Sequence, residues 1–508
     1  MLAKIFTFGL LGIEAYPVEI EVDVARGLPA VTIVGMADTA IRESKERVKT
    51  AIKNSGFSWP AERITVSLAP SNIKKEGSSF DLAIALGVLA ASGQVDTANL
   101  KDYFILGELS LDGLVRPVRG LLSIGLAAAK NEGAKILTPA VNACEAAVVS
   151  GINVFGIKSL KQAIEVIYGT HLLKPLKLDF AETFSQSLNY PVDFAEVKGQ
   201  RQARRALEVA VAGGHNILMI GPPGGGKTML AKRIPTIIPD LTLEEALEIT
   251  KIHSASGSLA YKTSVVGTRP FRSPHHSISD VALVGGGSIP QPGEISLAHG
   301  GILFLDELPE FRRNCLEALR QPLEDGIIYI SRAARSMVFP ASFMLVTAMN
   351  PCPCGYYTDR KRACRCNPNK IANYLGKISG PLLDRIDIHI EIPSIKYKEL
   401  TDTKDAESSK AIKMRVEKAR LRQRKRFESE KIFYNAQMSA KMIRSYCPLD
   451  SESIALLRLA MTELGLSARA YDKILKVAQT IADLSGSERI LAEHISEAIQ
   501  YRSLDRRW

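Results

Sequence analysis

The N-terminal part of the chain alternates short segments typical of strands with longer segments typical of helices. Residues Val18 to Val24 alternate apolar and charged side chains, which predicts a strand with one buried face. Residues Ala40 to Asn54 carry apolar side chains at helical spacing, with charged side chains on the other face. Ile64 to Leu68 predicts a second strand, and Phe80 to Ala91 a second, buried helix. Residues 1–170 are therefore expected to form an α/β domain.

The rest of the pattern predicts a linker, a second α/β domain and a helical tail. Residues 171–192 are polar with weak periodicity and contain Lys174-Pro175 and Tyr190-Pro191, as linkers do. Apolar runs at 216–220, 301–305 and 343–348 predict buried strands of a domain that spans 193–395. Residues 327–339 predict a hairpin before the last of these strands. Residues 396–508 begin with a polar stretch, lack strand patterns and predict a helical domain.

Length and composition agree with a folded chain of several domains. At roughly 100–200 residues per domain, 508 residues predict two to four domains. A hydrophobic fraction of 46% and a charged fraction of 23% argue against a disordered chain. The net charge of +11 permits an anionic partner such as nucleic acid without requiring one. We see neither a secretory signal pattern nor an apolar run of the roughly 18–20 residues that span a bilayer, so we expect a cytoplasmic protein without a membrane partner.

A phosphate-binding motif follows the strand predicted at 216–220. It matches the pattern G-x-x-x-x-G-K-[ST] at every position, with Gly221, Pro222, Pro223, Gly224, Gly225, Gly226, Lys227 and Thr228. In this motif glycines let backbone N–H groups turn toward phosphate oxygens, the lysine reaches the β- and γ-phosphates, and the threonine hydroxyl binds Mg²⁺. A helix predicted from Met229 adds a favourable dipole. The motif predicts a site for ATP and Mg²⁺.

Two carboxylates and an amide complete the predicted site. Asp306 and Glu307 end the apolar run at 301–305, where Asp306 would hold Mg²⁺ through water and Glu307 would polarise the attacking water. Asn350 follows the next predicted strand and would bond the γ-phosphate or position the water. The alternative for Asn350 is a turn residue before Pro351.

Four of the seven cysteines crowd together, which argues for a metal site rather than disulfides. Cys352, Cys354, Cys364 and Cys366 form two C-x-C pairs that match tetrahedral Zn²⁺ in general form, although C-x₂-C is the usual spacing. The alternative is reduced thiols in a surface loop. The other cysteines are isolated and are expected to be ordinary packed residues.

Several longer stretches carry a family resemblance. They are Arg272-Ser273-Pro274-His275-His276, the residues 293–299, 305–311 and 350–355, and Gly380-Pro381-Leu382-Leu383-Asp384-Arg385-Ile386-Asp387. Through them the chain resembles the magnesium-chelatase-like AAA+ ATPases of the ComM/YifB family over nearly its whole length. The resemblance implies a central AAA+ P-loop α/β domain, a C-terminal helical lid and closed rings, usually hexamers.

The resemblance also implies roles for two arginines. Arg385 matches the arginine finger, which reaches the γ-phosphate in a neighbouring subunit; its alternative is a salt bridge with Asp384 or Asp387. Arg469 matches the second sensor, a lid arginine that senses nucleotide.

Residues 1–170 resemble the peptidase domain of Lon, an α/β domain of the ribosomal S5 type, and the tail domain of the recombination protein RadA. The resemblance lies in residues 75–81 and 107–113 and places Ser79 at the nucleophile position. Leu122 stands where the catalytic lysine should follow, and a serine without a base is a weak nucleophile. We therefore expect a non-proteolytic platform that scaffolds the ring or binds DNA, with Lys74 and Lys75 as contributors.

Basic and glycine-rich segments bear on the function. Residues 252–292 resemble the helix insert of the chelatase clade, and Arg332 and Arg335 lie near the tip of the predicted hairpin, where pore loops grip a polymer. The basic run from Lys413 to Arg426 is either a solvated helix or a contact to phosphate backbones. The resemblance implies an ATP-driven helicase or translocase that binds DNA without sequence preference and drives branch migration in recombination or transformation. The alternatives are a metallation motor like magnesium chelatase and a protein-remodelling chaperone.

Overall fold

The chain forms two compact units, each built from separated parts of the sequence. The computed structural model describes all residues except 97, 171, 187–189, 260–262, 288–289, 333–334, 358, 360–361, 395–405 and 505–508. The first unit comprises Met1–Leu188, Thr242–Gly267 and Gly287–Pro292, and the second comprises Asn189–Leu241, Thr268–Gly286 and Gly293–Trp508. Among the described residues, no helix combines the length and the apolar character needed to cross a membrane.

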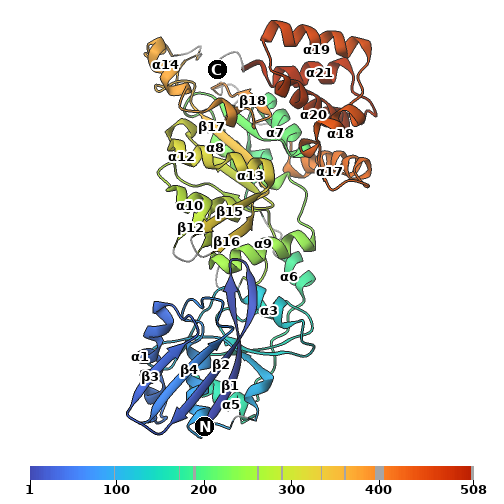
Figure 1. Cartoon of the computed structure of the whole chain (residues 1–508). Helices are drawn as coiled ribbons and strands as arrows, with labels where there is room; N and C mark the ends of the chain where they lie inside the picture. The colour runs from blue at the N-terminus through green and yellow to red at the C-terminus, as the bar shows by residue number, and fades with distance from the viewer. Residues whose placement is uncertain are drawn as a thin grey trace. The chain divides into compact units, whose positions relative to one another are not determined.

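The first unit is built on a seven-stranded mixed sheet (Figure 1). The alternation seen in the sequence places Val18, Ile20 and Val22 on its buried face. The long strands β1 and β2 pair antiparallel, while β8 and β9 pair parallel at one edge. The strand order is β3 (Ala30–Val34), β4 (Arg63–Ala69), β2 (Glu14–Ala25), β1 (Leu2–Leu11), β5 (Tyr103–Ile105), β8 (Lys135–Pro139) and β9 (Asn153–Ile157), with β6 (Glu108–Leu109) and β7 (Val115–Arg116) as a separate pair.

Helices cover this sheet according to their apolar surfaces. Helix α2 (Asp81–Ala91) is apolar all round and buried at every position, so it lies in the core against β1 and β2. Helix α1 (Thr39–Asn54) buries one stripe, and Asp38 caps its first turn by accepting a hydrogen bond from Ile41 N at 2.8 Å. The remaining helical segments before residue 188 are η1 (Leu100–Asp102), α3 (Leu121–Ala128), α4 (Cys144–Ala147), α5 (Leu160–Ile167) and α6 (Phe180–Gln186).

Helix α9 (Leu243–Ser256) belongs to the first unit although it follows the phosphate-binding motif in sequence. A capping box between Thr242 and Glu245 starts it. Near its end, Ser254 O accepts a hydrogen bond from Gly120 N at 3.0 Å, and Ser254 Oγ donates to Glu145 Oε2 at 2.6 Å. These bonds fix α9 on α3. The short strand β13 (Gln291–Pro292) is the other distant part of this unit.

The second unit contains a five-stranded parallel sheet. Strands β10, β14 and β17 are buried at every residue, as expected for a parallel sheet covered on both faces. The order is β11 (Phe271–Arg272), β14 (Ile302–Leu305), β17 (Met344–Met349), β10 (Ile217–Ile220) and β18 (Ile388–Glu391). Around it lie η2 (Phe194–Glu196), α7 (Arg201–Gly213), α8 (Lys227–Arg233), η3 (Ile234–Thr236), α10 (Asp280–Val284), β12 (Gly285–Gly286), α11 (Glu294–Leu297), η4 (Leu308–Glu310), α12 (Arg313–Ala318), α13 (Arg320–Asp325), α14 (Pro368–Leu375) and α15 (Gly380–Leu383).

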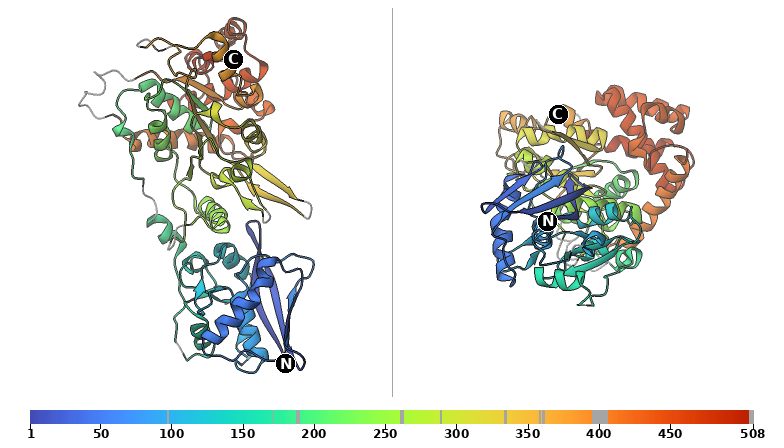
Figure 2. Two further views of the ribbon diagram at one scale, coloured as in Figure 1. Left: turned by 90° about the vertical axis from the view of Figure 1, so that its left-hand side faces the viewer. Right: turned by 60° about the horizontal axis from the view of Figure 1, so that its bottom comes forward.

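The predicted hairpin is formed by β15 (Ile327–Arg332) and β16 (Arg335–Pro340), which pair antiparallel. It extends away from the central sheet of its unit (Figure 2). Ile328, Ile330 and Phe339 are buried, whereas Met337 is only half-buried. The side chains of Arg332 and Arg335 lie outside the described part of the chain.

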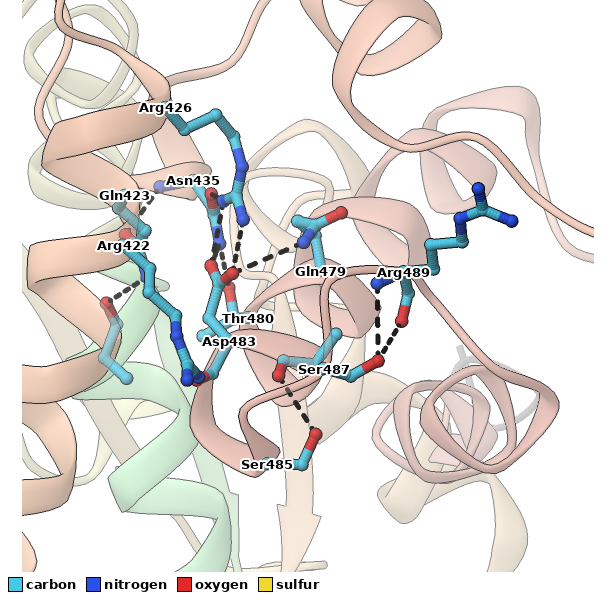
Figure 3. A network of polar contacts seen from close by, with 12 residues as sticks. Arg422, Gln423, Arg426, Asn435, Gln479, Thr480, Asp483, Ser485, Ser487 and Arg489 are labelled. Carbon is cyan, nitrogen blue, oxygen red and sulfur yellow. Dashed lines mark hydrogen bonds and ion pairs between the residues drawn. The ribbon is translucent and has the colours of Figure 1, made fainter.

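The tail after residue 408 is helical in its described residues, as predicted: α17 (Ser409–Arg426), η5 (Asn435–Gln437), α18 (Ala440–Tyr446), α19 (Ser451–Leu464), α20 (Ala468–Ser485) and α21 (Ala492–Gln500). A buried polar network joins α17 to α20 (Figure 3). The carboxylate of Asp483 accepts hydrogen bonds from Arg426 Nη1 and Asn435 Nδ2, both at 2.9 Å. A buried charge costs free energy unless it is paired, and here the pairing ties two lid helices together.

Two elements differ from the sequence expectation. The stretch expected as a linker contains α6, where Phe180 and Phe184 stack with ring centroids 6.5 Å apart. The stretch expected as an insert contains β11, which pairs with β14 and is therefore part of the central sheet. Both segments are too short for a periodic pattern to be recognised.

Candidate nucleotide-binding site

The phosphate-binding motif lies between β10 and α8, as predicted. Gly224 and Gly226 have φ values of +77° and +87°, a conformation that favours glycine. A Cβ at Gly221 would lie 2.2 Å from the carbonyl oxygen of Ile392, so only glycine fits there. The motif thus uses its glycines for backbone shape, and α8 begins directly at Lys227.

The ammonium group of Lys227 lies within the loop. Its Nζ donates to Gly221 O at 2.7 Å, to Pro222 O at 3.0 Å and to Asn350 Oδ1 at 3.1 Å. Burial lowers the pKa of Lys227, and the negative charges of Asp306 and Glu307 oppose that shift. A lysine that is buried among oxygen acceptors is poised to exchange them for phosphate oxygens, because charge-assisted bonds are the stronger ones.

Asp306, Asn350 and the loop meet because they follow neighbouring parallel strands. The order β14, β17, β10 places the carboxyl ends of all three strands at one edge of the sheet. Thr228 Oγ1 donates to Asp306 Oδ2 at 2.6 Å. A hydroxyl and a carboxylate oxygen this close form a donor set that suits Mg²⁺, which prefers oxygen ligands and keeps several waters.

Glu307 occupies an unusual backbone position beside this pair. Its φ is +54°, and its backbone N–H donates to Asp306 Oδ1 at 3.0 Å. Its side chain is 55% exposed, and Oε2 lies 3.2 Å from His276 Nδ1. Non-glycine residues in this conformation cluster at functional sites. In the sequence His276 is only part of the stretch 272–276, and its contact with Glu307 could not be predicted because the preceding strand β11 is too short for a periodic pattern.

Arg385 follows α15 and forms a different pair from those considered in the sequence. Its Nη1 donates to Pro381 O at 2.6 Å, and its Nη2 pairs with Glu324. Asp384 instead pairs with Arg469 Nη1 at 3.0 Å. The surface salt bridge proposed as the alternative role of Arg385 therefore exists, with another partner.

The segment that carries Arg385 is held by a buried charge cluster. Asp387 Oδ1 lies 3.2 Å from Lys473 Nζ, and Asp387 Oδ2 lies 3.4 Å from His215 Nδ1. Burial raises the pKa of Asp387, but the facing Lys473 and His215 outweigh it and hold that pKa well below its usual range. Arg502 Nη1 donates to Ile386 O at 2.6 Å. The lid thus fixes the backbone next to Arg385.

Arg469 lies in the first turn of α20 and is exposed. Its side chain is 70% exposed, and its described partner is Asp384. Its position in the first turn of a lid helix matches the position that the family resemblance implied.

The four clustered cysteines converge, as a metal site requires. Their Sγ atoms all lie within 4.8 Å of one another. Three of the Sγ–Sγ distances are 3.4, 3.7 and 3.6 Å, within the trio Cys352, Cys354 and Cys364. A tetrahedral site with Zn–S bonds of about 2.3 Å has edges of about 3.8 Å. Backbone N–H groups of Arg365 and Tyr356 lower the pKa of the Cys354 thiol to about 6. The donor set fits zinc.

The basic run in α17 is largely used inside the protein. Arg426 pairs with Asp483, Arg422 Nη1 donates to Asp483 O at 2.6 Å, and Arg415 Nε lies 2.5 Å from Glu208 Oε1. Lys418 and Arg424 are exposed. Several cations of the run are therefore bonded to carboxylates and carbonyl oxygens of other elements, and the run is not a solvated surface over its whole length.

Of the residues singled out in the Lon-like region, Leu122 and Lys75 are buried, whereas Ser79 is half-buried. Leu122 is fully buried, and its N–H donates to Ser254 Oγ at 3.5 Å. Lys75 is fully buried too, and its ammonium group donates to Pro70 O. Lys75 cannot contribute to a DNA-binding surface, contrary to expectation; Lys74 remains exposed at the surface beside Glu76.

Comparison with known proteins agrees with this arrangement. Models of the magnesium chelatase subunit ChlI match residues 193–400 and 20–142, and a model of its C-terminal region matches residues 406–502. The chain is 44% identical to the protein YifB of Escherichia coli (strain K12) over 506 residues, which cover 99% of this chain and 98% of YifB. It is also 44% identical to the competence protein ComM of Haemophilus influenzae over 511 residues, with the same coverage.

A more distant relative matches a shorter part of the chain. Lon protease 2 of Bacillus subtilis is 30% identical over 176 residues, which cover 32% of this chain and 30% of that protease. The α/β fold of the first unit agrees with this similarity. The full-length matches and the chelatase models together show that the chain belongs to the ComM/YifB family of magnesium-chelatase-like AAA+ proteins.

Proposed function

We propose that this chain is an ATPase that binds ATP and Mg²⁺ at residues 221–228. The observation that carries the proposal is the meeting of Lys227, Thr228, Asp306 and Asn350 at the carboxyl ends of adjacent strands. Backbone N–H groups of the loop would cradle the phosphates, and Lys227 would neutralise their charge. Thr228 and, through water, Asp306 would hold Mg²⁺, which neutralises charge that develops on the phosphate oxygens.

Glu307 is the proposed base in this site. It would accept a proton from the attacking water while Asn350 orients that water or the γ-phosphate. Its carboxylate is not surrounded by solvent alone, because Oε2 lies 3.2 Å from His276 Nδ1. We assign Glu307 the hydrolytic role because it is the second of two acids at the end of a buried strand.

We further propose that hydrolysis requires a ring of identical subunits, with a hexamer as the proposed size. In this ring Arg385 acts on the nucleotide of a neighbouring subunit, and Arg469 senses the nucleotide from the lid. The buried charge cluster around Asp387 supports this proposal, because it holds the backbone beside Arg385 in place. A finger supplied in trans contributes about 10³–10⁵ in rate.

The proposed work of this motor is movement along DNA, with branch migration in recombination or transformation as its outcome. Support comes from the relative named as a competence protein and from the projecting hairpin with Arg332 and Arg335. A metallation motor remains the second candidate, since the matching models are named after magnesium chelatase.

ATP hydrolysis by the purified full-length protein, with single-stranded, duplex and four-way-junction DNA, tests the proposal. We expect DNA to stimulate hydrolysis and Glu307→Gln to abolish it. Hydrolysis that no DNA changes would overturn the DNA motor while the ATPase assignment stands. Absence of any hydrolysis in the unmodified protein would overturn both.

We also propose Zn²⁺ as a bound cofactor of the cysteine cluster. Its support is the convergence of four thiols at spacings close to those of a tetrahedral site. Elemental analysis of the purified protein tests it, with about one zinc per chain as the expected result.

A further inference from the structure

The segment that contains the first two cysteines is bonded to the phosphate-binding loop. Met349 O accepts a hydrogen bond from Gly221 N at 3.2 Å. The next residue, Asn350, accepts a hydrogen bond from Lys227 Nζ through its Oδ1 at 3.1 Å. The adjacent residues Met349 and Asn350 therefore bond to the two ends of the loop, at Gly221 beside β10 and at Lys227.

A third contact comes from the turn that holds the cysteines. Gly355 N donates to Cys352 O at 2.9 Å, which closes this turn. Gly355 has a φ of +84°, and a Cβ at this position would lie 2.6 Å from Pro223 Cδ. The turn thus lies directly against the phosphate-binding loop, and two of the four clustered thiols, those of Cys352 and Cys354, belong to it.

The other two thiols come from a separate stretch of chain. Cys364 Sγ lies 3.7 Å from Cys352 Sγ and 3.6 Å from Cys354 Sγ. The cluster contains no histidine or carboxylate among the described residues. Four thiols with no open position are typical of a closed structural site, and soft thiolate ligands select zinc over magnesium or calcium.

We propose that zinc bound by Cys352, Cys354, Cys364 and Cys366 holds the 349–355 segment against the phosphate-binding loop, so that zinc occupancy sets the affinity for ATP. The inference rests on the nucleotide site proposed above. Binding of a structural metal contributes directly to folding free energy, because the ligands are not preformed without it. Loss of zinc frees the turn, and the loop then loses its contacts at Pro223 and Lys227.

Three variants of the full-length protein separate the steps of this inference. Cys364→Ser removes a ligand. Gly355→Ala keeps all four thiols but places a Cβ against Pro223 in a left-handed conformation, so it strains the contact with the loop while the set of metal ligands stays complete. Cys144→Ser is the matched control, because Cys144 lies in the first unit, outside the cluster.

Zinc content and affinity for a fluorescent ATP analogue are measured for each protein. We expect Cys364→Ser to lose zinc and to bind the analogue at least about 10-fold more weakly, as a binding loop that is no longer preorganised should. Gly355→Ala should retain zinc and still bind weakly, and Cys144→Ser should match the unmodified protein. Zinc added back after chelation should restore binding to the unmodified protein but not to Cys364→Ser.

Each other outcome overturns a distinct step. A purified protein without zinc that takes up none when zinc is supplied overturns the metal site. Equal affinity in zinc-loaded and zinc-free protein overturns the coupling and leaves the ATPase assignment intact. Zinc-loaded protein that does not bind the nucleotide at all overturns the proposed nucleotide site itself.

Discussion

The hydroxyl of Thr228 links the phosphate-binding loop to Asp306 through a hydrogen bond of 2.6 Å. Thr228→Val keeps the shape of the side chain but removes this oxygen, so the Mg²⁺ site loses a ligand. We expect kcat/KM for ATP to fall by about 100-fold, since a metal ion supplies several kcal/mol of charge stabilisation. Steady-state hydrolysis at several Mg²⁺ concentrations measures the effect.

Thr228→Ser is the control for this prediction because it retains the hydroxyl. It should keep activity within a few-fold of the unmodified protein. Equal loss in both variants would contradict the prediction, because the hydroxyl that Thr228→Ser retains would then not be enough to keep the site active.

Asp81 gives the first unit a pH dependence of a definite sign. Burial raises its pKa to about 6, although hydrogen bonds from Arg47 oppose the shift. A raised pKa means that the folded state holds the proton more tightly than the unfolded chain. The group therefore contributes stability below about pH 4, and up to roughly 3 kcal/mol of it is lost as the pH rises through 6.

Urea unfolding of the unmodified protein and of Asp81→Asn at about pH 4.5, 5.5 and 7 checks this sign. These pH values cover the range between the pKa of Asp81 in the unfolded chain and its pKa in the folded protein. As the pH rises, the unfolding free energy of the unmodified protein should fall relative to that of Asp81→Asn. A difference that is constant over this range would contradict the assignment.

At the residue scale, sequence motifs predicted which side chains meet at the nucleotide site. The pattern at 221–228 and the strand ends at Asp306 and Asn350 are local, and parallel strands bring their ends together. The pairing of Arg385 with Glu324 and the contact of Glu307 with His276 were not predicted. Both join residues far apart in sequence, and no spacing rule relates them.

Among the elements, α9 is held to the rest of the first unit in part by the buried hydrogen bond from Ser254 to Glu145. Ser254→Ala leaves the buried carboxylate of Glu145 with one partner fewer, which costs about 1–3 kcal/mol. Hydrogen exchange of the α9 amides should become faster. Ser256→Ala, on the same helix but bonded only to the local residues His253 and Ser258 in the described part of the chain, should leave exchange unchanged. Equal exchange in both variants would show that packing alone holds α9.

Elements with a strong period were predicted and short ones were not. The alternation in β2 allows only one face of the strand to be buried, and the continuous apolar run of α2 requires the whole helix to be buried. Strand β11 is only Phe271–Arg272, and its place in the sheet comes from pairing with β14. Helix α17 is basic around most of its circumference, so its sequence could not show that Arg426 faces Asp483 across the lid (Figure 3).

At the scale of the whole molecule, a ring predicts complementation between two inactive proteins. The Arg385→Ala protein retains the residues of its own nucleotide site but lacks the arginine finger. The Glu307→Gln protein retains the arginine finger but lacks the base for hydrolysis. Each protein alone should be inactive. Mixed rings should regain hydrolysis, because an Arg385→Ala subunit can receive the finger of a Glu307→Gln neighbour.

The same mixing with Lys227→Ala in place of Arg385→Ala provides the control, since both partners then lack a working site. No recovery in the first mixture, under conditions where size-exclusion chromatography shows mixed oligomers, would sink the trans role of Arg385.

The division of the chain into units has a consequence for inheritance. Residues 242–267 and 287–292 belong to the first unit yet are encoded within the stretch that builds the second. A cut near residue 188 therefore does not yield a self-sufficient first unit, because α9 and its bond to Glu145 would stay behind. Exchange of the N-terminal region between genes as a single cassette would separate partners that pack together. Selection should therefore preserve the two units as one heritable block.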